Sequence, residues 1–332
     1  MNGASPVWTE LDWDRNGKQI GPLNLPYSVT RSAYGVIAIP ACVVKNGVGP
    51  TLLLIAGNHG DEYEGQIALA RLIRALEPAA IQGRVIILPA INLPAALAGT
   101  RVSPLDDRNL NRAFPGDPAG TPTQQIAHFL DSVMFPIADQ VCDLHSGGSS
   151  LHYQVFASTH QSTDQAVTER GLAALRVFGA PLSVFWQTGS DLSFASHAAM
   201  KHGTPYLGGE YGGSGAVSRE GVALIGRGIR RLMAHMGITD KSTAPPDEPV
   251  RMVKVPSRDY FVYAPEPGLF EPATELGETV RAGQLCGEVH FVDNPARPPV
   301  PCHFKADGFV ICKRHFGRVE RGDCVAHLAI DA

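Results

Sequence analysis

Two short apolar runs separated by a helical pattern constrain the fold of this chain more than any other feature. Thr51–Ala56 is apolar at all but its first position, as is typical of a strand buried on both faces of a sheet. Asp61 and Glu64 then match a capping box at the start of a helix. An apolar stripe at helical spacing follows, made of Leu69, Leu72, Ile73 and Leu76. Because Arg84–Ile91 is a second apolar run, the order strand–helix–strand predicts a βαβ crossover.

The same alternation continues to about residue 240. Helical patterns cover 124–134, 165–177, 192–202 and 222–236. Strand patterns lie between them, near 140–144, 153–157, 182–186 and 205–209. The sequence therefore predicts an α/β fold, with a mixed sheet covered by helices on both faces. In the strand-rich first 56 residues, Asn16-Gly17 and Asn46-Gly47 are typical of two-residue hairpin turns.

A polar, proline-rich segment after residue 239 interrupts this pattern, and helical periodicity is lost beyond it. We therefore expect an α/β domain over 1–240, a linker over 241–250 and a small all-β domain over 251–332, built as a β sandwich or barrel. Within the last segment, Gly268–Val289 is loosely repeated by Gly308–Ala326. The repeat resembles the biotinyl/lipoyl hammerhead, but no lysine stands at a central hairpin tip. A packing role, or a role in a homo-oligomer, is therefore favoured over a carrier role.

Charge and cysteine content exclude several classes of protein. With 28 Lys and Arg against 32 Asp and Glu, and no basic run, the chain lacks the charge pattern of a nucleic-acid-binding protein. Its longest apolar runs are strand-sized, so no membrane association is expected. The first residues have neither a cationic region nor an apolar core, and the six cysteines contain no Cys-x-x-Cys pair. We expect a cytoplasmic protein with reduced thiols.

A histidine and a carboxylate directly follow the first apolar run, in Ala56-Gly-Asn-His-Gly-Asp-Glu-Tyr-Glu-Gly65. His59 and Glu62 lie across the predicted strand-to-helix turn, where open α/β sheets place their sites. His145 follows the predicted strand 140–144 and supplies a third side chain at another strand end. Catalytic zinc prefers three such ligands and keeps a fourth position for water. We predict a zinc site at His59, Glu62 and His145, with Asp143 orienting it.

Two further segments carry polar residues suited to hydrolysis. Glu210 ends a third predicted strand among glycines, and a carboxylate there is costly to bury unless it is paired or functional. Glu210 can therefore serve as the general base that accepts a proton from water. The turn-rich segment 99–116 contains Arg101, Asn111 and Arg112, which suit an anion and a developing oxyanion.

Together these motifs resemble one enzyme family. His59–Glu62, Asn109–Arg112, Asp143–His145 and Glu210 occur in the order found in the succinylglutamate desuccinylase/aspartoacylase family, a branch of the zinc carboxypeptidase-like amidohydrolases. The resemblance covers most of 50–215, and the family also has a trailing β domain. The longer motif that ends at Phe114-Pro-Gly116 is most similar to the bacterial branch that includes N-acetyl-diaminobutyrate deacetylase.

The resemblance implies a role for each motif residue. One zinc ion would be held by His59, Glu62 and His145, with Glu210 as general base and acid. Arg101 would polarise the scissile carbonyl, although Arg108 competes for this role because the loop is longer than in aspartoacylase itself. Asn111 and Arg112 would hold the substrate carboxylate. If Glu210 is not the base, Glu64 and Asp61 are the next candidates.

The implied activity is hydrolysis of the amide bond of a small N-acyl amino acid, which releases a carboxylate and a free amino acid. N-acetyl-diaminobutyrate is the substrate type that the motif favours. Two alternatives remain at this point: a zinc carboxypeptidase that uses the same metal site, and a binding protein that has lost turnover. The intact set of metal and base residues argues against the latter.

Overall fold

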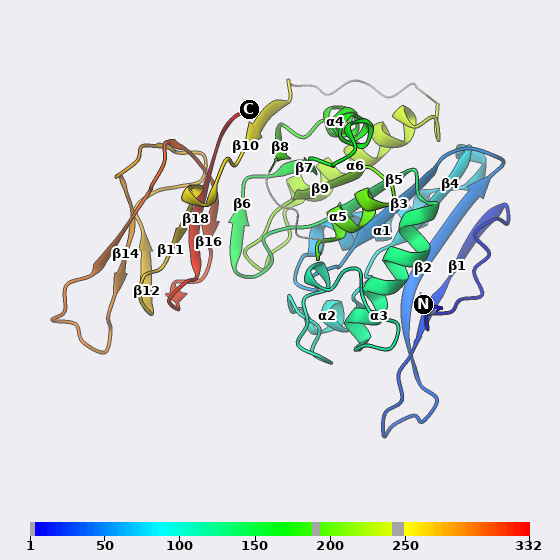
Figure 1. The fold of residues 1–332 in the computed structure, drawn as a ribbon, viewed down its shortest axis with the longest axis horizontal. Coiled ribbons are helices and arrows are strands. Elements are labelled where there is room, and N and C mark those ends of the chain that lie inside the picture. The colour runs from blue at the N-terminus through cyan, green and yellow to red at the C-terminus, as the bar shows by residue number, and fades with distance from the viewer. Residues whose placement is uncertain (1–3, 188–192, 241–248) are drawn as a thin grey trace.

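The computed structural model describes residues 4–187, 193–240 and 249–332, and its main feature is a long mixed β-sheet (Figure 1). Eight neighbouring strands from the first 210 residues run in the order β1-β2-β4-β3-β5-β9-β7-β8. Their bounds are β1 Gly17–Pro26, β2 Val36–Asn46, β3 Thr51–Ala56, β4 Gly83–Leu88, β5 Gln140–Leu144, β7 Phe156–His160, β8 Leu182–Trp186 and β9 Tyr206–Glu210. The β3, β4, β5 and β9 strands are parallel, which confirms the predicted crossover.

Helices cover both faces of this sheet, as the sequence predicts. Their bounds are α1 Tyr63–Ala75, α2 Leu93–Ala98, α3 Pro122–Phe129, α4 Gln165–Phe178, α5 Ala195–Lys201 and α6 Arg219–His235. On one face, α1 and α6 pack with alternate residues of β3 such as Leu52 and Leu54. On the other face, α3 and α5 pack with Leu53 and Ile55. The period-two alternation of side chains along β3 thus divides the apolar core into two layers.

The chain after residue 249 contains strands and one short 3₁₀ turn. The strands are β10 Arg251–Lys254, β11 Phe261–Tyr263, β12 Gly268–Pro272, β13 Thr279–Val280, β14 Leu285–His290, β15 Val300–His303, β16 Gly308–Arg314, β17 Arg318–Val319 and β18 Cys324–Asp331. Four of them form a separate antiparallel sheet in the order β15-β14-β12-β17. The predicted all-β character of this segment is confirmed.

The remaining C-terminal strands extend the large sheet. The β10 strand pairs in parallel with β8 and in antiparallel with β18. The β16 strand pairs with β18 and also with β6 (Leu151–Tyr153), a short strand from the first half of the chain. The division into domains at 241–250 stays a prediction, and residues 241–248 of the expected linker lie outside the described residues. No helix in the described parts of the chain is both long and apolar enough to span a membrane.

Two local predictions are wrong. Gly17 and Gly47 do adopt positive φ angles of 115° and 64°, but neither Asn-Gly pair closes a two-residue hairpin. Gly17 opens β1, whose hairpin with β2 closes at the opposite end, between Pro26 and Val36. The chain turns at Gly47 from β2 into β3, and these strands are not neighbours because β4 lies between them. Local conformation alone does not determine which strands pair.

The predicted capping box is also absent at the start of α1. Glu62 occupies the N-cap, without a side-chain capping bond. Asp61 instead accepts hydrogen bonds from the backbone and hydroxyl of Ser149, after β5. Glu64 accepts one from the Ser218 backbone N–H, 2.8 Å away, at the start of α6. Both carboxylates therefore hold neighbouring loops in place, and tertiary contacts replace the local cap.

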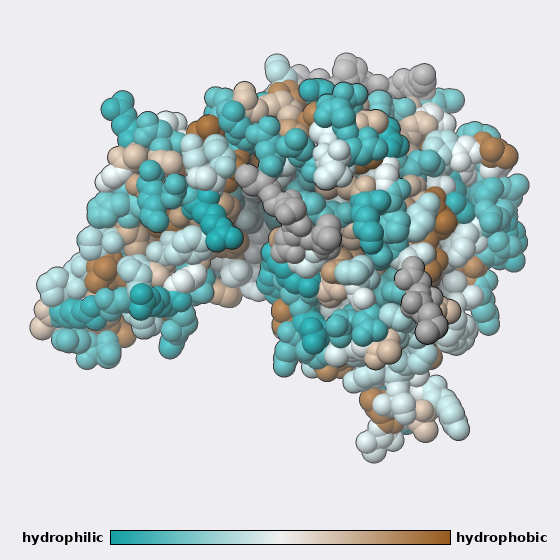
Figure 2. Space-filling model, in the orientation of Figure 1, coloured by the Kyte–Doolittle hydropathy of each residue, from teal (hydrophilic) through white to brown (hydrophobic). Residues whose placement is uncertain are grey.

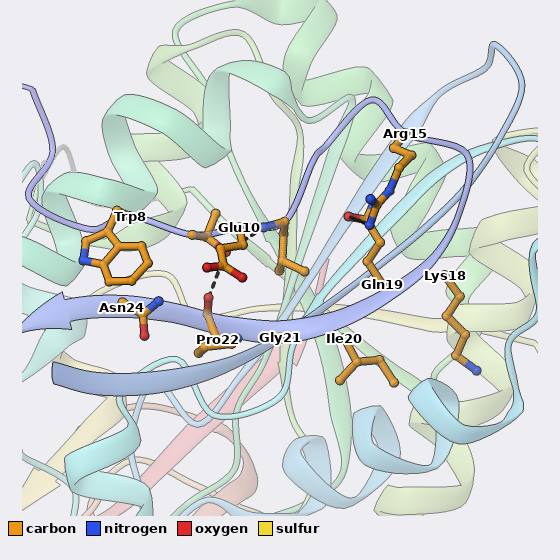
Figure 3. Close-up of a pocket in the computed structure, with 11 residues that line it drawn as sticks. Trp8, Glu10, Arg15, Lys18, Gln19, Ile20, Gly21, Pro22 and Asn24 are labelled. Carbon is orange, nitrogen blue, oxygen red and sulfur yellow. Dashed lines mark hydrogen bonds between the residues drawn. The ribbon is translucent and has the colours of Figure 1, made fainter.

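The outer edge of the sheet carries a hollow that is distant from the site described below. It lies along β1, beneath the segment of Trp8 and Glu10, and has a volume of about 530 Å³ (Figure 3). Strands β2, β4 and β3 separate β1 from β5. Hydrophilic residues cover most of the molecular face in Figure 2.

Candidate active site

Three parallel strands bring the predicted site residues together at their carboxyl ends. His59 follows β3, His145 follows β5 and Glu210 is the last residue of β9. The order β3-β5-β9 makes these strand ends neighbours, and His145 forms a backbone bridge with Glu210. Residues that are up to 151 positions apart in the chain thus converge because the crossovers return each strand in the same direction.

The Glu62 carboxylate lies between the two imidazoles. His59 Nδ1 is 2.6 Å from Glu62 Oε1, and His145 Nδ1 is 2.9 Å from Glu62 Oε2. All three side chains are buried, and their ligand atoms lie within 4.8 Å of one another. The residues form a compact group of two nitrogen donors and one carboxylate that can hold a metal ion.

Each imidazole is oriented through its other nitrogen. Asp143 Oδ2 lies 3.1 Å from His145 Nε2 and also accepts hydrogen bonds from Asn58 Nδ2 and the Tyr206 hydroxyl. Asn109 Oδ1 lies 3.1 Å from His59 Nε2. Such contacts fix the ring orientation of metal-binding histidines. The predicted position of Asp143 therefore agrees with an orienting role.

Three of these orienting residues escape the sequence analysis. Asn109 belongs to a motif that the sequence does single out, but nothing in its spacing indicates a contact with His59. Asn58 directly precedes His59, and Tyr206 opens the strand that ends at Glu210. Alternation along β9 is the only available signal for Tyr206, since positions 206, 208 and 210 share one face of a regular strand.

A close helix–strand approach sets the position of Glu62. Gly65, in the first turn of α1, faces Leu144 of β5, and a Cβ at Gly65 would lie 2.6 Å from the Leu144 Cβ. Only glycine permits this spacing without displacement of the helix. Because Glu62 and His145 adjoin this contact in the sequence, the packing of α1 on β5 determines how closely the two ligands approach.

The surroundings of the site shift the pKa values of its two carboxyl groups, Glu62 and Glu210, in opposite directions. Burial raises the pKa of Glu62, but His59 and His145 outweigh it and hold the value well below its usual range. Burial and the negative charge of Glu62 raise the pKa of Glu210 to about 8. Glu210 Oε2 is buried and has no hydrogen-bond partner among the described residues. A carboxyl group in this environment is suited to exchanging a proton near neutral pH.

Arg101 and Arg108 are the two candidates for polarising the scissile carbonyl, and Arg101 lies beside His59 and Glu62. Arg101 Nη1 is 3.3 Å from Glu62 Oε1 and 3.3 Å from His59 Nδ1, and nearly half of its side chain is exposed. The contacts described for Arg108 are made by its backbone, to Ser103 and Asp106. This geometry favours Arg101.

The contacts described for Asn111 and Arg112 are made near the start of α5 and not with His59, Glu62 or His145. Asn111 Oδ1 accepts a hydrogen bond from the Ala195 backbone N–H, 2.9 Å away, at the start of α5. The Arg112 guanidinium stacks over the Phe194 ring, 3.8 Å from its centroid, and lines a neighbouring cavity. Asn111 thus ties its loop to α5, and Arg112 is the member of this pair that borders open space.

Comparison with known proteins places this arrangement in a known group. Residues 48–236 match the succinylglutamate desuccinylase/aspartoacylase catalytic domain. The chain is 38% identical over 325 residues to the N-alpha-acetyl-L-2,4-diaminobutyric acid deacetylase of Halomonas elongata. The aligned region covers 98% of this chain and 95% of that protein.

Two solved structures share the whole fold. A succinylglutamate desuccinylase/aspartoacylase from Rhodobacter sphaeroides is 42% identical, with a TM-score of 0.93 over 99% of both chains. The product-bound ectoine utilization protein EutE (DoeB) from Ruegeria pomeroyi is 38% identical, with a TM-score of 0.95 over 99% of this chain and 100% of that one. The chain therefore belongs to the succinylglutamate desuccinylase/aspartoacylase family of amidohydrolases.

Proposed function

We propose that this chain is a zinc-dependent deacylase of N-acyl amino acids, of the N-acetyl-diaminobutyrate deacetylase type. The observation that carries the proposal is the convergence of His59, Glu62 and His145 beside the unpartnered carboxyl oxygen of Glu210. The similarity to the Halomonas elongata deacetylase supports the choice of substrate.

The donor set fits zinc. Two imidazole nitrogens and one carboxylate are the ligands of several catalytic zinc sites, and they leave a coordination position open. His59 Nδ1, His145 Nδ1 and Glu62 would hold one ion per chain, with Asp143 and Asn109 orienting the rings. When bound, zinc supplies a Lewis acid that polarises a carbonyl and lowers the pKa of a water molecule.

Glu210 supplies the proton transfers in this proposal. Its raised pKa and its position beside His145 suit a group that accepts a proton from the attacking water. The same carboxyl then donates a proton to the departing nitrogen as the amide bond breaks. Without that donation the amine would leave as an unstable anion.

Arg101 and Arg112 act on the substrate in different ways. Arg101, within 3.3 Å of Glu62, would stabilise the negative charge that develops on the carbonyl oxygen. Arg112 would bind the carboxylate in the ground state and the transition state alike, which lowers KM more than it raises kcat. Asn111 would support this loop through its bond to α5.

The test is a comparison of substrates with the zinc-loaded protein. Amine release is measured from Nα-acetyl-L-2,4-diaminobutyrate, from other N-acetyl and N-succinyl amino acids and from dipeptides. We expect fastest hydrolysis of the diaminobutyrate derivative, and hydrolysis about 10²–10⁴-fold slower by the Glu210→Gln variant at equal zinc content. Preferential cleavage of dipeptides would instead identify a carboxypeptidase, and hydrolysis of none of these compounds would refute the proposal.

A further inference from the structure

A cavity of about 750 Å³ lies between the loop that contains Arg112 and the segment after residue 250. Arg112 and Phe194 line it from one side, Trp186 of β8 lies at another, and Arg258 and Phe261 follow β10 in the chain. Its volume falls within the range of small-molecule sites, about 300–1,000 Å³. Segments from both halves of the chain thus enclose one space.

The charges around this cavity favour an anion. Two arginines, Arg112 and Arg258, line the cavity, and the described residues of its lining include neither Asp nor Glu. The ring of Phe194 holds the plane of the Arg112 guanidinium by stacking, which suits two-point binding of a carboxylate. A space with two cations and apolar walls focuses a positive potential, which attracts an anionic ligand.

His160, which also lines the cavity, does not change this balance. Burial and the neighbouring His197 lower the pKa of His160 to about 3, so His160 is neutral at physiological pH. Its Nδ1 atom is buried and has no hydrogen-bond partner among the described residues. His160 therefore adds a neutral polar group and no positive charge.

The cavity borders the metal-binding group through two routes. Arg112 lies three residues after Asn109, whose side chain contacts His59 Nε2. On another side, the His160 ring lies 6.0 Å from the ring of Tyr206, whose hydroxyl bonds to Asp143. The residues that line the cavity are therefore linked to the metal-binding group by the loop of Asn109 and by Tyr206.

We propose that Arg258 is a specificity-determining residue that binds the substrate's carboxylate together with Arg112. This inference rests on the proposed function, since it identifies the substrates of that site as free acids. The aromatic walls formed by Trp186 and Phe261 contact the remainder of the amino acid. The segment after residue 250 thereby supplies part of the substrate pocket.

The first test pairs two variants with two substrates. Hydrolysis of Nα-acetyl-L-2,4-diaminobutyrate and of its carboxamide is assayed with the wild type, Arg258→Gln and Arg321→Gln. Arg321→Gln is the matched control, because Arg321 is an exposed arginine of the same segment. A lost charge-assisted hydrogen bond corresponds to an increase of about 10- to 100-fold in KM. We expect that increase for Arg258→Gln with the acid only, with kcat and the Arg321→Gln variant little changed.

Equal effects of Arg258→Gln on hydrolysis of the acid and of the amide, or no effect on either, would overturn the role of Arg258. Hydrolysis by the wild type would still support the proposed deacylase function.

A second readout, ligand binding, needs no turnover. Trp186 lines the cavity, so its fluorescence, identified with Trp186→Phe, reports binding of L-2,4-diaminobutyrate and its amide. If no substrate is hydrolysed, the proposed function fails, but weaker binding of the acid alone to Arg258→Gln still supports the carboxylate site. Unchanged binding refutes it.

Discussion

Asp143→Asn is the sharpest test of the proposed zinc site. Asp143 Oδ2 receives three contacts, from His145 Nε2 at 3.1 Å, the Tyr206 hydroxyl at 3.1 Å and Asn58 Nδ2 at 3.2 Å. Asp143 Oδ1 is buried and has no hydrogen-bond partner within the described parts of the chain. An asparagine can therefore place its carbonyl where Oδ2 stands and its NH₂ where Oδ1 stands, so that shape is kept and the charge is lost.

The loss of that charge sets the expected magnitude. A hydrogen bond to an ionised partner is roughly twice as strong as a neutral one, and the loss of such outer contacts costs about 10–100-fold in metal affinity. We expect Asp143→Asn to weaken zinc binding by this factor, about 1.4–2.7 kcal/mol. Tyr206→Phe removes one donor to the same oxygen and should have a smaller effect.

Zinc affinity is measured by competition with a chromophoric chelator, and thermal unfolding checks that each variant is folded. Asp131→Asn is the matched control, because Asp131 Oδ1 lies 3.2 Å from His202 Nε2 in a histidine–aspartate pair outside the metal-binding group. If Asp143→Asn binds zinc as tightly as Asp131→Asn, the reasoning that Asp143 orients a zinc ligand is wrong.

Four further predictions concern catalysis, binding and stability. Glu210→Gln should retain zinc and lower kcat by about 10²–10⁴-fold in steady-state assays, whereas a change in KM alone would contradict its role in proton transfer. Arg112→Lys keeps the charge but loses the planar fork, so KM should rise with kcat nearly constant, and the reverse would show the two roles exchanged. Gly65→Ala should lower the free energy of unfolding in urea by about 1–3 kcal/mol because its Cβ meets Leu144. Gly226→Ala in α6, whose Cβ would make only an ordinary contact with Arg230 Nη1 at 3.8 Å, should raise it by about 0.5–1 kcal/mol, and equal effects would refute the packing argument. Burial lowers the pKa of His327 from 6.5 to about 4, so the neutral ring contributes fully to stability above pH 6.5 and this contribution is lost as the pH falls toward 4. His327→Phe should therefore remove up to about 3 kcal/mol of the decrease in unfolding free energy between pH 6.5 and pH 4. An unchanged decrease between the two pH values would contradict this prediction.

The sequence predicts those features that depend on short-range pattern. Strand Thr51–Ala56 is apolar enough to be recognised alone, and the strand-to-helix turn after it locates His59 and Glu62. His145 is predicted as their partner because parallel strands end at one edge of a sheet. These features follow from periodicity and from a general rule of α/β topology.

Features that depend on pairing between distant segments are not predicted. The strand expected at 153–157 is divided, because Leu151–Tyr153 pairs with β16 and Phe156–His160 pairs with β8. Asp61 and Glu64 match a local cap but bond to Ser149 and Ser218, which no local pattern indicates. The contact between Asn109 and His59 likewise depends on how a loop without periodicity is folded.

The pairing of β10 with β8 has a consequence for the chain during its synthesis. Until residues 251–254 leave the ribosome, β8 has β7 on one side and an open edge on the other, beside the apolar side chains of Phe156 and Val184. The β10 strand in turn gains its second neighbour only with β18, at the end of the chain. Exposed strand edges of this kind invite pairing with other chains. The nascent protein therefore carries an exposed strand edge until β18 has been synthesised and pairs with β10.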